Sequence, residues 1–257
     1  MQKIQSQIRE ACLNRFYEQG YFITPEPDMI EQSWLVNFLS EKWRNQLIEG
    51  YPSLDSVVRE TEIGNYHEMS HQLDHSSFWT KQRRIFSEIE ISQLLKHVSV
   101  FEELLEVFGD YEVADLEGIG YPEIYWRLVR PSCPEDVASP HKDSWFWTVT
   151  NKIASERQSN LIKVWLPVVT IPSESGLSIS PSSHKKEIPF TSETRHGRSK
   201  PTVNQADIAA FEMVKLPLVT GQAVVFHRDL LHQGIAHVLP ITRVSVEFAI
   251  ETKNKYD

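Results

Sequence analysis

Two histidines and one aspartate in the second half of the chain have the residue types of a metal site. His141 and Asp143 are separated by one residue, and in an extended strand residues i and i+2 project to the same face. Both could therefore reach one ion, with a third ligand expected from a distant strand, for which His232 is our candidate. Two imidazoles and one carboxylate form the facial triad that binds non-haem Fe(II) and leaves coordination positions open.

An arginine and a serine follow the candidate third ligand. Arg243 lies eleven residues after His232, and Ser245 lies two residues later, on the same face of a predicted strand. The planar, permanently charged guanidinium suits the distal carboxylate of a dicarboxylic acid, and the serine hydroxyl adds a second donor. The sequence therefore predicts a metal centre with a carboxylate-binding pair beside it.

These residues stand in an order that resembles the phytanoyl-CoA hydroxylase-like branch of the Fe(II)/2-oxoglutarate-dependent dioxygenases. The order and spacing agree from about residue 125 to residue 248, and residues 16–23 are similar to the usual opening of that family. The resemblance rests on His141-x-Asp143, Trp165, Gly176-Leu177, Pro181-Ser182-Ser183-His184-Lys185, His232, Arg243 and Ser245.

The resemblance implies a fold, a set of cofactors and a reaction. The fold would be mainly β with flanking helices: a double-stranded β-helix (jelly-roll, cupin-like) core with an N-terminal helical buttress. Fe(II) would be held by His141, Asp143 and His232, 2-oxoglutarate would be gripped by Arg243 and Ser245, and O2 would be consumed with release of succinate and CO2. Hydroxylation of an unactivated C–H bond is expected, because related halogenases lack the carboxylate that Asp143 provides.

Three histidines near the C-terminus compete for the role of third ligand. The ligand must be followed by a residue that can bind a carboxylate, at the spacing seen in families of this kind. His232 is followed at that spacing by Arg243, whereas His227 and His237 are followed by a valine and a phenylalanine. His184, in the Pro-Ser-Ser-His-Lys run, is interpreted as a structural residue of a turn.

Further residues are predicted to line the pocket. The resemblance places Trp165 beside the iron and the cosubstrate, and alternation along the strand turns Lys163 to the same side. An inward lysine needs a partner, for which a carboxylate of 2-oxoglutarate or of the substrate is one option, so Lys163 is a cosubstrate-contact candidate; a solvated strand end is the other interpretation. We include two further cosubstrate-contact candidates, the i, i+2 pair Tyr125 and Arg127, and three substrate-contact candidates, Trp145, Trp147 and Arg198.

A second motif, His67-Glu68-Met69-Ser70-His71, supports a different function. On one helix, His67 and His71 would share a face, and Glu68 could activate a zinc-bound water, as in a metallopeptidase. The bland interpretation is a polar helix face without a metal. A third hypothesis is a jelly-roll protein that keeps the metal site formed by residues 141, 143 and 232 but lacks oxygenase turnover.

Composition narrows the class of protein further. A hydrophobic content of 40% and an aromatic content of 11% are typical of a folded globular chain. The net charge of −9 argues against an extended nucleic-acid surface. Cys12 and Cys133 match no metal or redox spacing, and no apolar run approaches the ~20 residues of a membrane helix. We expect a cytoplasmic protein that acts on a small molecule and binds neither nucleic acid nor membrane.

The organisation along the chain favours one domain of 257 residues. Residues 1–120 carry mainly helical patterns, and residues 121–257 carry short β-rich segments, expected at 124–129, 144–149, 161–171, 177–180, 223–226 and 244–250. The polar insertion at 185–215 is either a lid over the substrate or a solvated surface element. The several inward cations favour a small, polar or anionic substrate.

Overall fold

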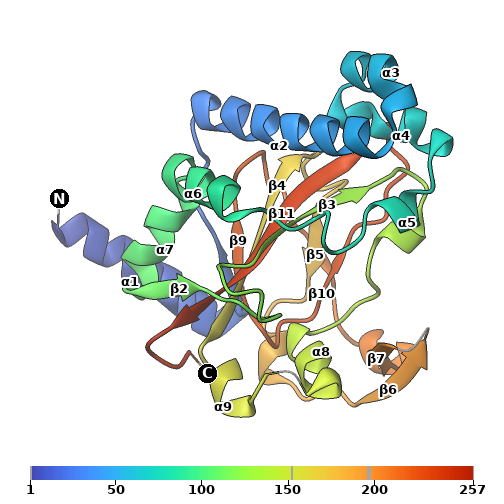
Figure 1. Cartoon of the computed structure of the whole chain (residues 1–257). Coiled ribbons are helices and arrows are strands. Elements are labelled where there is room, and N and C mark those ends of the chain that lie inside the picture. The colour runs from blue at the N-terminus through green and yellow to red at the C-terminus, as the bar shows by residue number, and fades with distance from the viewer. Residues whose placement is uncertain (1, 152, 196–197, 257) are drawn as a thin grey trace.

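The computed structural model describes residues 2–151, 153–195 and 198–256, and its framework is an antiparallel sheet of six strands (Figure 1). The strands follow the order β1-β9-β4-β11-β2, and β3 also pairs with β11. Their bounds are β1 Tyr21–Ile23, β2 Tyr111–Val113, β3 Ile124–Val129, β4 Leu161–Val169, β9 Val224–His227 and β11 Arg243–Thr252. A second sheet has the order β10-β5-β8, with β5 Leu177–Ile179, β8 Val214–Lys215 and β10 His232–Gly234.

Helices make up most of the first half of the chain. The main ones are α1 Gln2–Gln19, α2 Met29–Gly50, α3 Asp55–Glu60, α6 Glu88–His97 and α7 Val100–Phe108. Shorter α-helices are α4 Tyr66–Met69, α5 His75–Phe78, α8 Asp143–Thr150, α9 Ser155–Gln158 and α10 Gln205–Ile208. Single turns of 3-10 helix occur at Pro52–Leu54, Ile63–Asn65, Ser70–Gln72, Pro134–Asp136 and Ser183–Lys185.

The two faces of the large sheet differ in polarity because side chains alternate along each strand. One face is apolar and packs under the helices, with buried residues that include Trp126 on β3, Val164 on β4 and Val246 on β11. The neighbouring residues of the same strands, such as Arg127 and Trp165, line a cavity shared with the small sheet. The predicted β core with flanking helices is therefore confirmed, and the polar face of the sheet is the one that positions the site.

Helix α2 provides the largest buttress and lies across the large sheet in Figure 1. The Asp28 side chain caps its N-terminus by accepting hydrogen bonds from the backbone N–H groups of Ile30 and Glu31 at 2.9 and 2.8 Å. A stripe at i, i+4 spacing faces the sheet and is fully buried: Leu35, Leu39, Trp43 and Leu47. The helical half therefore holds the apolar face of the sheet out of water.

The strand predicted at residues 144–149 is wrong, because this segment forms helix α8. Its aromatic and β-branched composition suits a strand, yet two threonine hydroxyls donate to carbonyls four residues back, Thr148 to Ser144 and Thr150 to Phe146. Asn151 ends the helix in the left-handed conformation. Tertiary packing on both sides of α8 decides the conformation against local propensity.

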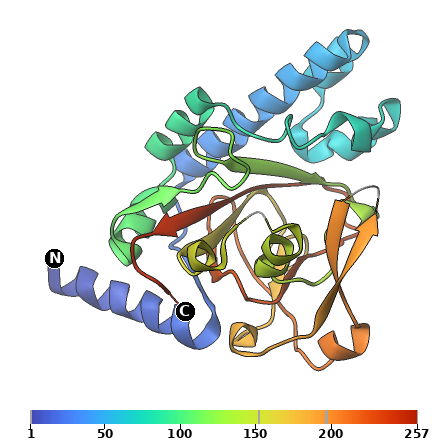
Figure 2. The ribbon, with the colours of Figure 1, turned by 60° about the horizontal axis from the view of Figure 1, so that its bottom comes forward.

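The polar insertion folds as a two-stranded hairpin, β6 Phe190–Arg195 and β7 Arg198–Val203, followed by α10 and β8. The hairpin contacts α8, beside which it lies in Figure 2. None of the described residues from 186 to 212 lines the cavity between the sheets, so the lid hypothesis stays untested. Among the described residues, no helix has both the length and the apolarity to cross a bilayer.

Leu39→Ala in α2 is expected to lower the free energy of unfolding by about 2–5 kcal/mol, because it leaves a cavity under the sheet. Ile30→Ala on the same helix is the matched control. Its side chain is 80% exposed, so the expected change stays within about 0.5 kcal/mol. Urea denaturation measures both variants, and equal losses would contradict the assigned orientation of the helix.

Candidate metal centre

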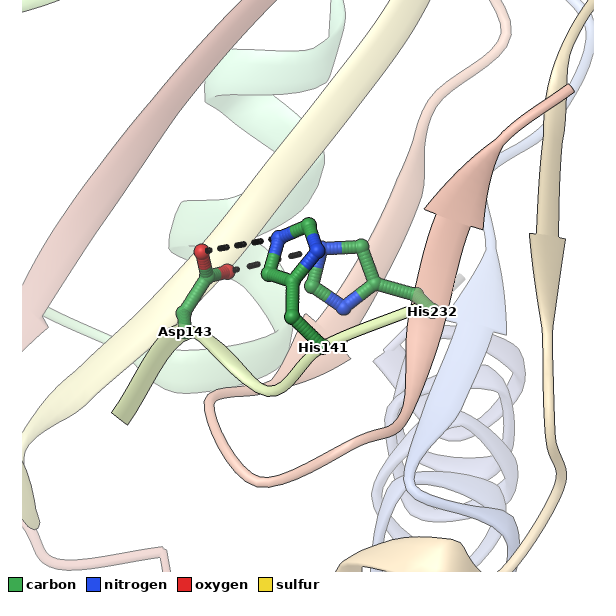
Figure 3. Close-up of side chains that lie close together, drawn as sticks. All are labelled: His141, Asp143 and His232. Carbon is green, nitrogen blue, oxygen red and sulfur yellow. Dashed lines mark ion pairs between the residues drawn. The ribbon is translucent and has the colours of Figure 1, made fainter. Parts of the chain in front are cut away.

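The side chains of His141, Asp143 and His232 point toward one another (Figure 3) and border the cavity between the two sheets. One ligand atom from each lies within 4.8 Å of the other two. The Nε2 atom of His141 is 4.0 Å from one carboxylate oxygen of Asp143, and the Nε2 atom of His232 is 3.9 Å from the other. In the part of the chain that the structure describes, this is the only group of three such residues that is close enough to hold an ion.

The backbone of the two histidines fixes the distance between them. His141 and His232 form an isolated antiparallel bridge in which each backbone N–H donates to the other's carbonyl at 3.0 Å. The segment before α8 thereby attaches to β10, and the two ligands become cross-strand neighbours. The two imidazole rings are therefore close together, with centroids 4.3 Å apart.

The same atom of each imidazole points to the metal position. The Nδ1 atom of His141 lies 2.7 Å from the carbonyl of Ser139, and that of His232 lies 2.9 Å from the carbonyl of Leu230. Since a carbonyl can only accept, Nδ1 must carry the proton in both rings. The lone pair is then on Nε2, in the tautomer that metal-binding histidines adopt when a backbone carbonyl orients them.

Asp143 reaches the centre from the first turn of α8. The neighbouring residue, Ser144, fixes the start of the helix. Its backbone N–H donates to the Arg228 carbonyl at 3.2 Å, and its hydroxyl donates to Asp229. The i, i+2 expectation therefore succeeds for a reason other than the predicted strand: residues 141 and 142 are extended, and only Asp143 begins the helix.

The electrostatics of the centre favour a neutral His141 ring and an ionised Asp143 carboxylate. Burial, with a contribution from the neighbouring His232, lowers the pKa of His141 to about 4. Burial alone would raise the pKa of Asp143, but Lys163, His232 and His141 outweigh it, and the net pKa is lowered. One carboxylate oxygen, Oδ2, has no hydrogen-bond partner among the described residues. Two neutral nitrogens and a free carboxylate oxygen are the donor set that a divalent cation requires.

Arg243 lies further along the cavity, at the start of β11, and is 3% exposed. Its Nη1 atom donates to the carbonyls of Ser175 and Gly176 at 3.1 and 2.7 Å, and its guanidinium carbon is 5.8 Å from the centroid of the Trp165 ring. Burial and then Arg127 lower its pKa to about 10, so it remains charged at neutral pH. The Nε atom of Arg243 and the hydroxyl of buried Ser245 have no hydrogen-bond partner within the described chain.

The three triad residues and Arg243 line one cavity of about 250 Å³, whereas the buried Ser245 is not part of its lining. Of the predicted cosubstrate contacts, Arg127, Lys163, Trp165 and Arg243 line it. Tyr125 does not line the cavity, and its ring centroid lies 5.0 Å from the Lys81 ammonium.

Several lining residues were missed from sequence, and two of them contact residues that were predicted. Glu247 forms a 2.6 Å ion pair with Arg127 inside the cavity, and Phe146 packs edge-to-face against the His141 ring at 5.1 Å. The alternation of Arg243, Ser245 and Glu247 along one strand could have identified the first. Phe146 could not be found once residues 144–149 were read as a strand.

The tryptophans predicted to shape the substrate mouth are buried elsewhere. Trp145 stacks on Phe190 of the hairpin at 5.1 Å, and Trp147 packs with Ile153 and Leu161 on the other side of α8. On a helix the two residues diverge, so neither lines the cavity, which takes Phe146 instead. The side chain of Arg198, also predicted to contact substrate, lies outside the described residues.

The residues of the zinc motif do not form a site in the described structure. Helix α4 ends at Met69 and a 3-10 turn follows, so His67 and His71 are not on one α-helix. His67 contacts the Thr242 hydroxyl at 3.1 Å, and Glu68 and His71 are exposed. Of the rejected third ligands, His227 accepts from the backbone of Asp229 at 3.0 Å, and His237 is buried away from the centre.

Comparison with solved structures identifies the same fold in distant proteins. The epimerase SnoN of nogalamycin biosynthesis, in complex with Fe3+, α-ketoglutarate and nogalamycin RO, is 15% identical with a TM-score of 0.57, over 96% of this chain and 84% of that one. The carbocyclase SnoK of the same pathway gives 15% and 0.58, over 96% and 85%. EctD from S. alaskensis, with 2-oxoglutarate and 5-hydroxyectoine, gives 13% and 0.51, over 93% and 74%. No curated protein matches the sequence significantly.

The solved structures share the cupin-like fold of this chain, and the triad with Arg243 has the residue types needed to bind iron and 2-oxoglutarate. The residues fit both groups, since the donor set suits Fe(II) and the unpaired Arg243 Nε and Ser245 hydroxyl suit a carboxylate. The sequence matches the phytanoyl-CoA dioxygenase (PhyH) family over residues 17–243, and the chain belongs to that family.

Trp145→Ala is expected to lower the free energy of unfolding by about 3–5 kcal/mol, because it removes the ring that joins α8 to the hairpin. Phe146→Ala, on the next position of the helix, is the matched control and should cost clearly less, because that ring already borders the cavity. Both values come from urea denaturation. A larger loss for Phe146→Ala would show that the two rings have been assigned to the wrong sides of α8.

Proposed function

We propose that the protein hydroxylates an unactivated C–H bond of a small, polar metabolite, using Fe(II), 2-oxoglutarate and O2. The observation that carries this proposal is the arrangement in one cavity of the triad His141, Asp143 and His232 with the buried carboxylate-binding residue Arg243. A lone metal site would not need the arginine, and a lone anion site would not need the triad.

The three ligands have distinct tasks in this proposal. His141 and His232 would hold iron through Nε2, with their Nδ1 protons committed to the carbonyls of Ser139 and Leu230. Asp143 would supply the anionic ligand, and its presence argues against a halide in that position. Bound iron, with 2-oxoglutarate and O2, supplies the oxidising power for C–H attack and yields succinate and CO2 as co-products.

Arg243 and Ser245 would bind the far carboxylate of 2-oxoglutarate. The guanidinium is already oriented by two backbone carbonyls and by the Trp165 ring, so it needs no rearrangement to receive an anion. Because the site is buried, the charge-assisted hydrogen bond is stronger than it would be in water. The serine hydroxyl then gains the partner that it lacks within the described chain.

The apolar lining has the task of excluding water and positioning substrate. Phe146, Val137, Leu177 and Phe226 border the cavity next to the triad. The volume of about 250 Å³ is below the range of roughly 300–1,000 Å³ of drug-sized ligand pockets, which supports a small substrate. Proteins of the same fold include an epimerase and a carbocyclase. Mass detection of a gain of one oxygen atom distinguishes hydroxylation from such outcomes.

Asp143→Ala should remove the only anionic ligand of the triad and lower both iron content and 2-oxoglutarate-dependent succinate release, the latter by at least about 100-fold. His71→Ala is the matched control, because it removes an exposed histidine of the rival zinc motif and should retain both. Metal analysis and a succinate assay over a metabolite panel, with mass detection of a gain of one oxygen atom, provide the measurements. Loss of metal in His71→Ala, or full turnover in Asp143→Ala, would refute the assignment.

Gly234→Ala should weaken 2-oxoglutarate binding by about tenfold. A Cβ at this position would lie 3.1 and 3.2 Å from the two terminal nitrogens of Arg243 and 3.2 Å from a methyl of Val137, so the guanidinium would have to shift. Gly176→Ala is the control, because its Cβ would meet nothing nearer than 3.7 Å. Anaerobic titration of the visible absorption of the iron–2-oxoglutarate chelate gives both affinities, and an unchanged affinity in Gly234→Ala would contradict the role of Arg243. If wild-type protein with Fe(II) gives no such band, the metal-binding protein without turnover is favoured.

A further inference from the structure

Lys163 is a cation of the cavity wall with no contact partner. It lies on β4, two residues before Trp165 and therefore on the same strand face, and it lines the cavity beside the triad. Its ammonium forms no hydrogen bond and no ion pair with any described residue. A lysine that is half-buried in a pocket and has no partner is poised to receive an anion.

The other charges of the cavity are already matched. Arg127 is paired with Glu247 at 2.6 Å. Asp136 accepts from the guanidinium of Arg130 at 2.8 and 2.9 Å, outside the ring of lining residues. Only Arg243, Lys163 and Asp143 remain, and together they leave one positive charge.

Loading the site does not change that balance. Iron adds two positive charges and 2-oxoglutarate adds two negative ones, so the loaded cavity keeps one positive charge. Asp143 becomes a metal ligand and Arg243 is neutralised by the far carboxylate. The unmatched charge is then on Lys163, which is half-buried in the cavity wall.

Lys163 and Arg243 stand at opposite ends of the cavity wall. In the register of the sheet, Lys163 pairs with Ala249 of β11, whereas Arg243 begins that strand six residues earlier. At about 3.3 Å per residue the two positions are roughly 20 Å apart along the strand. On its other side Lys163 pairs with Phe226 of β9, whose ring centroid lies 4.7 Å from that of His232, so Lys163 is at the metal end. An anion at Lys163 is therefore separate from the carboxylate at Arg243.

We propose that Lys163 binds a carboxylate of the substrate, which makes the substrate class a small, singly charged organic acid oxidised at a carbon near its acid group. This inference rests on the proposed function and specifies the substrate of that same site. Glu247 has a positioning part, because its ion pair with Arg127 keeps that guanidinium from competing with Lys163 for the carboxylate. The apolar residues beside the triad would contact the carbon chain.

The test uses full-length protein loaded anaerobically with Fe(II) and 2-oxoglutarate, and isothermal titration with butyrate and with butyramide, a neutral molecule of nearly the same shape. Butyrate is expected to bind at least about tenfold more tightly than butyramide. Lys163→Met should abolish that preference, and Lys163→Arg should restore most of it. Lys253→Met, which removes an exposed lysine of the same type, should behave like wild type.

The absorption band of the iron–2-oxoglutarate chelate distinguishes failure of the proposed function from failure of the substrate-carboxylate site. Absence of the band in wild-type protein overturns the proposed function itself. A normal band with equal binding of the two probes, or binding of neither, overturns the substrate-carboxylate site alone. A Lys163→Met variant that loses 2-oxoglutarate affinity as strongly as Gly234→Ala would place Lys163 at the cosubstrate and also overturn the inference.

Discussion

The reciprocal pair of backbone hydrogen bonds between His141 and His232 is the constraint on which the centre depends. It links two segments separated by about ninety residues and sets the distance between the imidazoles before any metal binds. Backbone hydrogen bonds suit this task, because they fix Cα positions whereas side-chain contacts would leave the rings free to rotate. The carbonyls of Ser139 and Leu230 then remove that rotation, and each lies two residues before the histidine that it orients. The site is thus preorganised by main chain.

Charge compensation is the second principle of the cavity. Eight charged or ionisable groups of the described chain border it, six of them Asp, Glu, Lys or Arg and two of them the histidines of the triad. Arg127 and Glu247 neutralise each other, Asp136 is satisfied by Arg130 from outside, and Arg243 is solvated by two carbonyls. The buried groups of the site left without a hydrogen bond within the described chain are a carboxylate oxygen of Asp143, the Nε atom of Arg243 and the hydroxyl of Ser245. Leaving buried polar groups unsatisfied costs stability, and such a cost is expected where ligands complete the set.

The candidate metal ligands and the candidate carboxylate pair could be predicted from sequence because residue spacing and the family resemblance both point to them. Alternation along β11 places Arg243 and Ser245 on one face, and the spacing after His232 excludes the neighbouring histidines. Helix α8 was not predictable in this way. Its composition suits a strand, and its conformation depends on contacts between Ser144 and residues 228 and 229, which no local pattern reveals. Because the two-residue period of a strand was assumed for a helix, Trp145, Phe146 and Trp147 were all assigned to the wrong sides.

Lys142, the residue between His141 and Asp143, links the candidate metal site to the turn that contacts the first helix. Lys142 is 4% exposed, and its ammonium donates to the carbonyls of Ser183 and Lys186 at 3.0 and 2.7 Å. The hydroxyl of Ser183 in turn accepts from the backbone of Leu231, next to the third ligand. His184, predicted to be structural, contacts the Tyr17 carbonyl of α1 at 3.1 Å. The Pro-Ser-Ser-His-Lys turn therefore connects the first helix to both metal-binding segments, and the motif is explained by support of the ligands without any contact to the metal.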